Sequence, residues 1–98
     1  MGKNFDRTGG LGPALISVDV LPPGAHGLRL RSRLDGATMQ GSTTADMIFP
    51  VARLMSLLSE TMTLDPGDVI ATGTPSGVGY ARKPPVYMRP GDICEINT

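Results

Sequence analysis

The stretch LRLRSRLDGATMQ, residues 28–40, carries a strong signal for a β-hairpin. Leucines and arginines alternate from Leu28 to Leu34, with leucines on one side and arginines on the other, and this period of two indicates a half-exposed strand. Asp35-Gly36 then predicts a tight hairpin, because both central residues of a type I′ turn need positive φ. We expect residues 37–40 to return as a second strand.

Downstream of the hairpin, the sequence predicts one helix over residues 50–60. Pro50 suits the first turn of a helix, where its missing N–H is no loss. The following apolar residues have helical spacing and form one stripe, which we expect to be buried against the sheet: Val51, Leu54, Met55, Leu58 and Met62. Upstream, the mostly apolar residues 14–20 predict another strand, followed by a turn-rich connector at 21–27.

Two short segments echo each other near the end of the chain. LDPGDVI at 64–70 and MRPGDIC at 88–94 each place Pro-Gly before an aspartate. We interpret them as the same turn used twice, because a repeat architecture needs three or more units. Between them, residues 71–80 indicate a strand that runs into a glycine-rich loop. Both ends of the chain look cut, so we expect an incomplete domain.

The composition excludes several classes of protein. Nine basic residues balance nine acidic ones along 98 residues, and aromatic residues are scarce, so nothing favours nucleic acid as a partner. Cys94 is the single cysteine, which excludes an internal disulfide and suits a reducing compartment. No apolar run approaches the ~20 residues that span a bilayer. The expectation is a cytoplasmic protein that binds no membrane.

Few residues could carry chemistry by their pattern alone. The one histidine, His26, lies in the turn-rich connector, and no Gly-x-Ser-x-Gly elbow is present, which disfavours a serine hydrolase. The acidic residues are scattered, with no Glu-x-Glu or Asp-x-Asp pair, so the chain alone offers no complete metal site. An isolated Lys3 is normally a solvent-exposed residue, and it would be functional only if it were buried near a cation or an enolate.

The glycine-rich loop at 73–79 has two readings. It can be a tight turn whose glycines need positive φ. Alternatively, its backbone N–H groups, together with the hydroxyls of Thr72 and Thr74, can hold an anionic group of a substrate. The pattern of residues leaves both readings open.

Four blocks, in order, resemble the fumarylacetoacetate hydrolase family. GKNFD at 2–6 with LGP at 11–13 resembles its Gly-Lys-x-Phe-Asp…Gly-Pro motif, and Gln40 with Thr44-x-Asp46-Met47-Ile48-Phe49 resembles its Gln…Asn-Thr-x-Asp-Met-Ile-Phe motif. MTLDPGDVIATGTPSGVG at 62–79 is similar to its most distinctive signature, and PGD at 90–92 matches its closing turn. Together they cover nearly the whole chain.

The resemblance implies a β-rich α/β roll with one main helix, with residues 1–98 as the C-terminal part of a single catalytic domain. Members are commonly homodimers that bind Mg²⁺ or Mn²⁺. They act on small 2-oxo or 2-enol acids by hydrolysis of acylpyruvates, decarboxylation of oxaloacetate or isomerisation of hydroxymuconate-type diacids. The shared logic is a cation that stabilises an enolate.

The resemblance also implies roles for particular residues. Lys3 would neutralise enolate charge, and Glu95 would pair with a catalytic histidine from an upstream segment. Thr72, Gly73 and Thr74 would contact the substrate, with Gly73 allowing close approach of the backbone.

Departures from the family pattern leave a second hypothesis open. The family's Glu-x-Glu pair and metal-binding aspartate lie before the Gly-Lys motif, where this chain has only Met1. Thr43 replaces the usual asparagine, and Arg7-Thr8-Gly9-Gly10 replaces a more apolar stretch. The alternative to a metal-dependent enzyme is therefore an inactive remnant or a non-catalytic scaffold that binds a partner.

Overall fold

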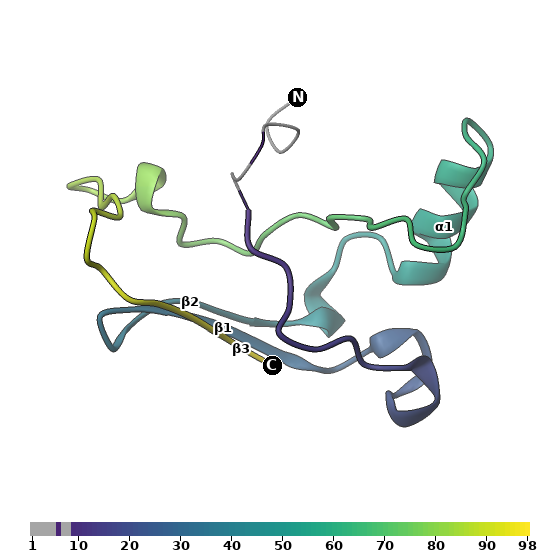
Figure 1. The fold of residues 1–98 in the computed structure, drawn as a ribbon, viewed down its shortest axis with the longest axis horizontal. Coiled ribbons are helices and arrows are strands. Elements are labelled where there is room, and N and C mark those ends of the chain that lie inside the picture. The colour runs from purple at the N-terminus through teal and green to yellow at the C-terminus, as the bar shows by residue number, and fades with distance from the viewer. Residues whose placement is uncertain (1–5, 7–8) are drawn as a thin grey trace.

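The fold is a mixed α/β arrangement built on a three-stranded antiparallel sheet (Figure 1). The computed structural model describes residue 6 and residues 9–98. Strand β1 (Arg29–Leu34) lies between β2 (Ala37–Thr43) and β3 (Cys94–Asn97), in the order β2-β1-β3. The predicted hairpin is confirmed, and its return strand runs three residues beyond residue 40.

The hairpin turn confirms the reading of Asp35-Gly36. Asp35 has φ 49° and Gly36 has φ 80°, so both central residues have the positive φ that a type I′ turn needs. The turn is also bonded to the residue that precedes β3: the Asp35 N–H donates to the Ile93 carbonyl at 2.9 Å, and the Ile93 N–H donates to the Asp35 carboxylate at 2.8 Å. These two bonds bring distant parts of the chain together at one end of the sheet.

The expected alternation of β1 holds only in part. The pairing with β2 shifts register between Ser32 and Arg33, which is the signature of a bulge. Arg33 pairs with Glu95 of β3, and their side chains form a salt bridge with an N–O distance of 2.9 Å. Arg33 is therefore half-buried, and the expectation that all three arginines share an exposed face was wrong for this one.

Helix α1 (Val51–Ser59) matches the predicted helix, with Pro50 and Glu60 as its flanking residues. Its predicted packing was wrong. The helix lies beyond one end of the sheet (Figure 1) and contacts the 3-10 turn Pro23–Ala25. In the predicted stripe, Val51, Leu54 and Leu58 are half-buried, whereas Met55 and Met62 are 43% and 54% exposed.

Two predicted strands are absent from the described part of the chain. Residues 14–20 are irregular and end in a 3-10 turn at Val18–Val20. Residues 71–80 are also irregular, and the 3-10 turn Gly79–Ala81 closes that stretch. Apolar composition favours an extended backbone, but a strand also needs a partner for its ladder of hydrogen bonds. The described sheet supplies that partner only to β1, β2 and β3.

The two Pro-Gly-Asp segments form the same turn, as predicted. Gly67 has φ 102° and Gly91 has φ 100°, the positive φ that a type II turn needs after proline. The Asp68 N–H donates to the Asp65 carbonyl, and the Asp65 N–H donates to the Asp68 carboxylate at 2.9 Å. Arg89 and Asp92 exchange the same two bonds, with 2.8 Å for the carboxylate contact.

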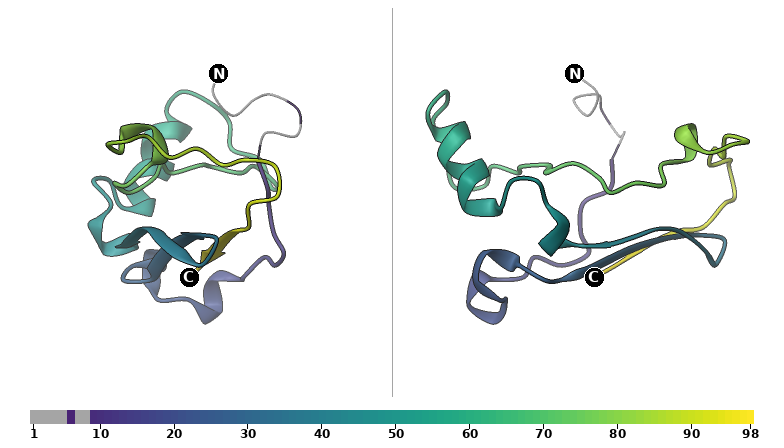
Figure 2. Two further views of the ribbon diagram at one scale, coloured as in Figure 1. Left: turned by 90° about the vertical axis from the view of Figure 1, so that its left-hand side faces the viewer. Right: turned by 180° about the vertical axis from the view of Figure 1, so that it is seen from behind.

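No apolar side chain is fully buried within residue 6 and residues 9–98. Large apolar side chains stand in solvent instead, with exposed fractions of 98% at Leu15 and 90% at Ile48. Views from the side and from behind agree with this openness: the long loops run at a distance over one face of the sheet, and the helix lies beyond its end (Figure 2). In the part of the chain that the structure describes, no helix has both the length and the apolar character to cross a membrane.

Candidate functional site

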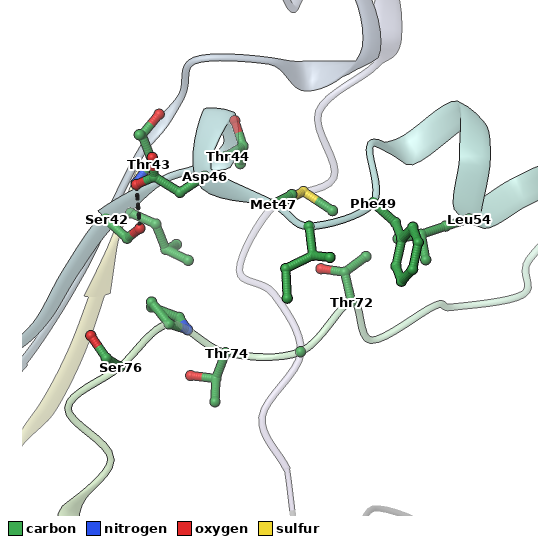
Figure 3. A pocket seen from close by; sticks show the side chains of 14 residues that line it. Ser42, Thr43, Thr44, Asp46, Met47, Phe49, Leu54, Thr72, Thr74 and Ser76 are labelled. Atoms are coloured by element: carbon green, nitrogen blue, oxygen red, sulfur yellow. Dashed lines mark hydrogen bonds between the residues drawn. The ribbon is translucent and has the colours of Figure 1, made fainter.

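The glycine-rich loop forms one wall of the main pocket, which has a volume of about 670 Å³. The other wall is the segment that leads from the end of β2 into α1 (Figure 3). Polar and apolar side chains both line the pocket, the chief ones being Ser42, Asp46, Phe49, Leu54, Thr72 and Thr74. Residues from the two motif blocks, 40–49 and 62–79, therefore face each other across one pocket.

Asp46 stabilises the wall that is formed by the segment between β2 and α1. Its carboxylate accepts from the Ser42 hydroxyl at 2.8 Å and from the Thr43 N–H at 3.3 Å. The Thr43 hydroxyl in turn accepts from the Ala45 N–H at 3.2 Å, which completes a capping box around the 3-10 turn Thr44–Asp46. The hydrogen bonds of the Asp46 carboxylate thus stabilise this turn, and the turn orients the segment from Met47 to Phe49.

The glycine loop is bent at Gly73 and Gly77, both with φ 101°, a value that side chains disfavour. This confirms that the loop contains turns that require glycine. The threonines on either side of Gly73 point in different directions. The Thr72 side chain extends toward Met47 and Phe49, whereas the Thr74 side chain extends from the other side of the stretch (Figure 3).

Gln40 of β2 joins the loop to the sheet. Its side-chain nitrogen donates to the Thr74 hydroxyl oxygen at 2.9 Å and to the Pro75 carbonyl at 2.8 Å. Gln40 is part of the sequence motif, but a single glutamine carries no spacing signal that would indicate its role. The contact spans 34 residues and appears only in the folded chain.

Arg82 makes a second connection between the loop and the sheet, and no pattern in the sequence predicted it. Its guanidinium donates to the Gly77 carbonyl at 3.1 Å and also to the Met39 carbonyl. Arg82 follows the 3-10 turn Gly79–Ala81, and the Gly79 carbonyl of this turn also accepts from the Val86 N–H at 3.0 Å. The loop is therefore fixed to adjacent residues of β2, at its Thr74-Pro75 and Gly77 positions.

The sequence-predicted site residues fall in three places. Thr72, Gly73 and Thr74 line the pocket together, while Lys3 lies outside the described residues. Glu95 is held on β3 by Arg33 and does not line this pocket. His26 is an exposed residue of the connector, as expected.

The dark purple segment after Gly9 passes beside the segment that carries the glycine loop in all three views (Figures 1 and 2).

The described residues do not form a metal site by themselves. Among them, no group of three or more His, Cys, Asp or Glu side chains is placed to hold an ion. Asp46, the carboxylate that lines the pocket, is occupied by its own turn. The residues that the structure describes therefore do not by themselves fit a Mg²⁺ or Mn²⁺ ion.

Solved structures define the class of this fold. A fumarylacetoacetate hydrolase from Exiguobacterium antarcticum matches with a TM-score of 0.82 at 38% identity, over 88% of this chain and 30% of the other. A probable 2-hydroxyhepta-2,4-diene-1,7-dioate isomerase from Mycobacterium abscessus matches with a TM-score of 0.68 at 39% identity, over 70% of this chain and 26% of the other. The fold is thus that of α/β enzymes of the hydrolase and isomerase kind.

The sequence profile described as Fumarylacetoacetate (FAA) hydrolase C-terminal matches residues 1–98. The chain belongs to the fumarylacetoacetate hydrolase family, and the resemblance seen in the sequence is confirmed. Among curated relatives, the mitochondrial oxaloacetate tautomerase fahd2 of Xenopus laevis is 46% identical over 99% of this chain, and tautomerase FAHD2A of Bos taurus is 48% identical over 98%. The chain spans 31% of the length of each. Both are named mitochondrial, so a cytoplasmic location stays a prediction.

Proposed function

We propose that this chain is the C-terminal part of a fumarylacetoacetate hydrolase family catalytic domain that acts on small 2-oxo or 2-enol acids. The reaction passes through an enolate, and the residues of this chain hold the acid group of the substrate. Oxaloacetate is the first substrate to test, because relatives 46–48% identical to this chain are named oxaloacetate tautomerases. The complete enzyme is proposed to be a homodimer.

One observation carries the proposal: the loop that holds Thr72, Gly73 and Thr74 is bent by glycine and tied to the sheet at two points. A hydroxyl and backbone N–H groups held in fixed positions are suited to an oxyanion, since no reorganisation is needed when charge develops. Gly73 lacks a Cβ, so an acid group can approach its backbone closely. Thr74 is proposed to donate to the substrate, with Thr72 on the opposite side of the loop.

Lys3 and Glu95 complete the set of proposed residues. Lys3 is proposed to neutralise the charge of the enolate, a role that rests on the family motif alone. Glu95 is proposed to orient a histidine from another part of the protein. Its Oε1 atom is occupied by Arg33 at 2.9 Å, so the histidine contact would use Oε2.

The proposal includes a Mg²⁺ or Mn²⁺ ion held by carboxylates from outside this chain, because the described residues do not form such a site. Such an ion acts as a Lewis acid toward a 2-oxo carboxylate. The residues of this chain contribute what the ion does not: the Thr74 hydroxyl, held by Gln40, and close approach to the backbone at Gly73.

The test is turnover by the protein expressed from its complete coding sequence. The substrates are oxaloacetate, followed for both tautomerisation and decarboxylation, an acylpyruvate and a hydroxymuconate-type diacid, each with Mg²⁺, with Mn²⁺ and with chelator. We expect metal-dependent turnover of at least one of them. Absence of turnover on the whole set would contradict the proposal.

A second function, that of a non-catalytic module which binds a partner, is favoured by a different observation. The described residues have no buried apolar side chain and expose many large ones, Leu15 and Ile48 among them. Sedimentation and thermal unfolding of residues 1–98 alone separate the two functions. A stable monomer would count against the partner-binding module.

A further inference from the structure

We infer that Gln40 is a positioning residue, which holds Thr74 so that the hydroxyl proton of Thr74 is left to donate to the substrate. The inference rests on the proposed function for the identity of the acceptor, a carboxylate or enolate oxygen. Gln40 lies on β2 and Thr74 lies on the glycine loop, and their contact is the one side-chain to side-chain bond that the described structure gives between these two elements.

The orientation of the Gln40 amide follows from its neighbours. A backbone carbonyl can only accept, so the group 2.8 Å from the Pro75 carbonyl must be the amide nitrogen. On the other side, the Ser32 hydroxyl donates to the amide oxygen at 3.3 Å. The two contacts agree, and together they turn the nitrogen toward the loop.

The polarity of the Thr74 hydroxyl then follows. A hydroxyl has one proton to donate and two lone pairs to accept with. The amide nitrogen of Gln40, 2.9 Å away, can only donate, so it occupies a lone pair of the Thr74 oxygen. The Thr74 proton is thereby left for another acceptor, which is what an anionic substrate provides.

The second tie keeps this arrangement in place. Arg82 joins the Gly77 carbonyl to the Met39 carbonyl, so the loop is attached to neighbouring residues of β2 on both sides of Ser76. A Cβ built on Gly77 would lie 3.3 Å from the Gln40 side chain and 2.7 Å from the Met39 carbonyl oxygen, which shows how closely loop and strand approach. Such pre-organisation reduces the ordering that binding would otherwise require.

The test uses the protein from its complete coding sequence with oxalate as an anionic probe, in the presence of Mn²⁺. Gln40→Leu and Thr74→Val should each weaken the binding of oxalate about 10-fold or more, the loss expected for a hydrogen bond to a charged group. The double variant should bind oxalate with about the same affinity as the single variant that binds it less tightly, because Gln40 acts through Thr74. Additive losses would overturn the inference.

Gln40→Glu replaces the amide that donates to Thr74 with a carboxylate that can only accept, and this makes the test more specific. A carboxylate accepts the Thr74 proton, so this variant should bind oxalate more weakly than Gln40→Leu and raise KM for oxaloacetate more than it lowers kcat. Thr74→Ser keeps the hydroxyl and should retain binding within about threefold, while Thr63→Val, an exposed threonine outside the site, is the matched control. Stronger binding by Gln40→Glu than by Gln40→Leu would overturn the inference.

A structural measurement covers the case in which Gln40 variants fail to fold. The side-chain amide signals of Gln40 in ¹⁵N NMR should shift in Thr74→Val and stay in place in Thr63→Val, and an unchanged signal in Thr74→Val would overturn the inference. If the wild-type protein binds no oxalate and converts no 2-oxo acid, the proposed function fails. The NMR result then reports separately whether Gln40 holds Thr74.

Discussion

A Cβ atom on Gly77 would lie 2.7 Å from the carbonyl oxygen of Met39, closer than side chains are found in folded proteins. This close approach of the glycine loop to β2 leaves no room for a side chain, which explains why the loop needs glycine at that position. Its φ of 101° adds a second reason, because side chains rarely adopt this conformation.

The first prediction separates these two reasons. Gly77→Ala combines the clash with the strain of φ, whereas Gly67→Ala, at φ 102° with open space around it, carries the strain alone. We expect Gly67→Ala to lower the free energy of unfolding by about 1–2 kcal/mol and Gly77→Ala to lower it by more. Urea denaturation measures both. Equal losses would mean that the close approach to Met39 does not matter.

The second prediction concerns the two matching turns. Asp68→Ala and Asp92→Ala each remove the carboxylate that accepts a backbone N–H, at 2.9 Å and 2.8 Å. We expect similar losses of about 0.5–1.5 kcal/mol in unfolding free energy at both positions. Asp65→Ala is the control, because Asp65 contributes its backbone to the turn. A large loss at one turn and none at the other would contradict their equivalence.

The third prediction concerns Arg33 and Glu95. Their side chains are 31% and 39% exposed, so solvent screens the pair, and the salt bridge should contribute only about 0.2–1 kcal/mol. Arg33→Met and Glu95→Gln should therefore lower stability by similarly small amounts. If Glu95 orients a histidine, Glu95→Gln should reduce turnover far more than Arg33→Met does. Equal turnover in the two variants would remove Glu95 from the proposed catalytic residues.

The fourth prediction concerns Lys3, whose role rests on the family motif. Lys3→Ala should lower kcat by the equivalent of about 2–4 kcal/mol in activation free energy, the range for loss of a donor to a developing oxyanion. The affinity for Mn²⁺ should change much less. Lys83→Ala provides a matched control, because Lys83 is an exposed lysine. Equal loss of turnover and of metal affinity would contradict the assigned role.

Local signals in the sequence predicted the local structure well. Asp35-Gly36 identified the hairpin, Pro50 and the apolar stripe identified α1, and the two Pro-Gly-Asp segments identified a shared turn. Each of these depends on φ preferences or on spacing within a few residues. Sequence patterns report such preferences directly.

Longer-range arrangements were harder to predict. The stripe of α1 indicated that one face is apolar, but not that the helix would lie beyond the end of the sheet. Residues 14–20 and 71–80 have the composition of strands, yet strands form only where another strand pairs with them. Gln40 bonds to the loop across 34 residues, and Arg82 bonds to Met39 of β2 across 43 residues, separations that no local pattern encodes.

We propose that this chain supplies the Thr74 loop of an enzyme for small 2-oxo acids. The most direct test is kcat/KM for oxaloacetate tautomerisation by the protein from its complete coding sequence, compared with Thr74→Val and Thr74→Ser. We expect measurable turnover, a loss of about 10-fold to 100-fold in Thr74→Val, and near wild-type activity in Thr74→Ser. Turnover that is unaffected in Thr74→Val, or absent from the wild-type protein, would contradict it.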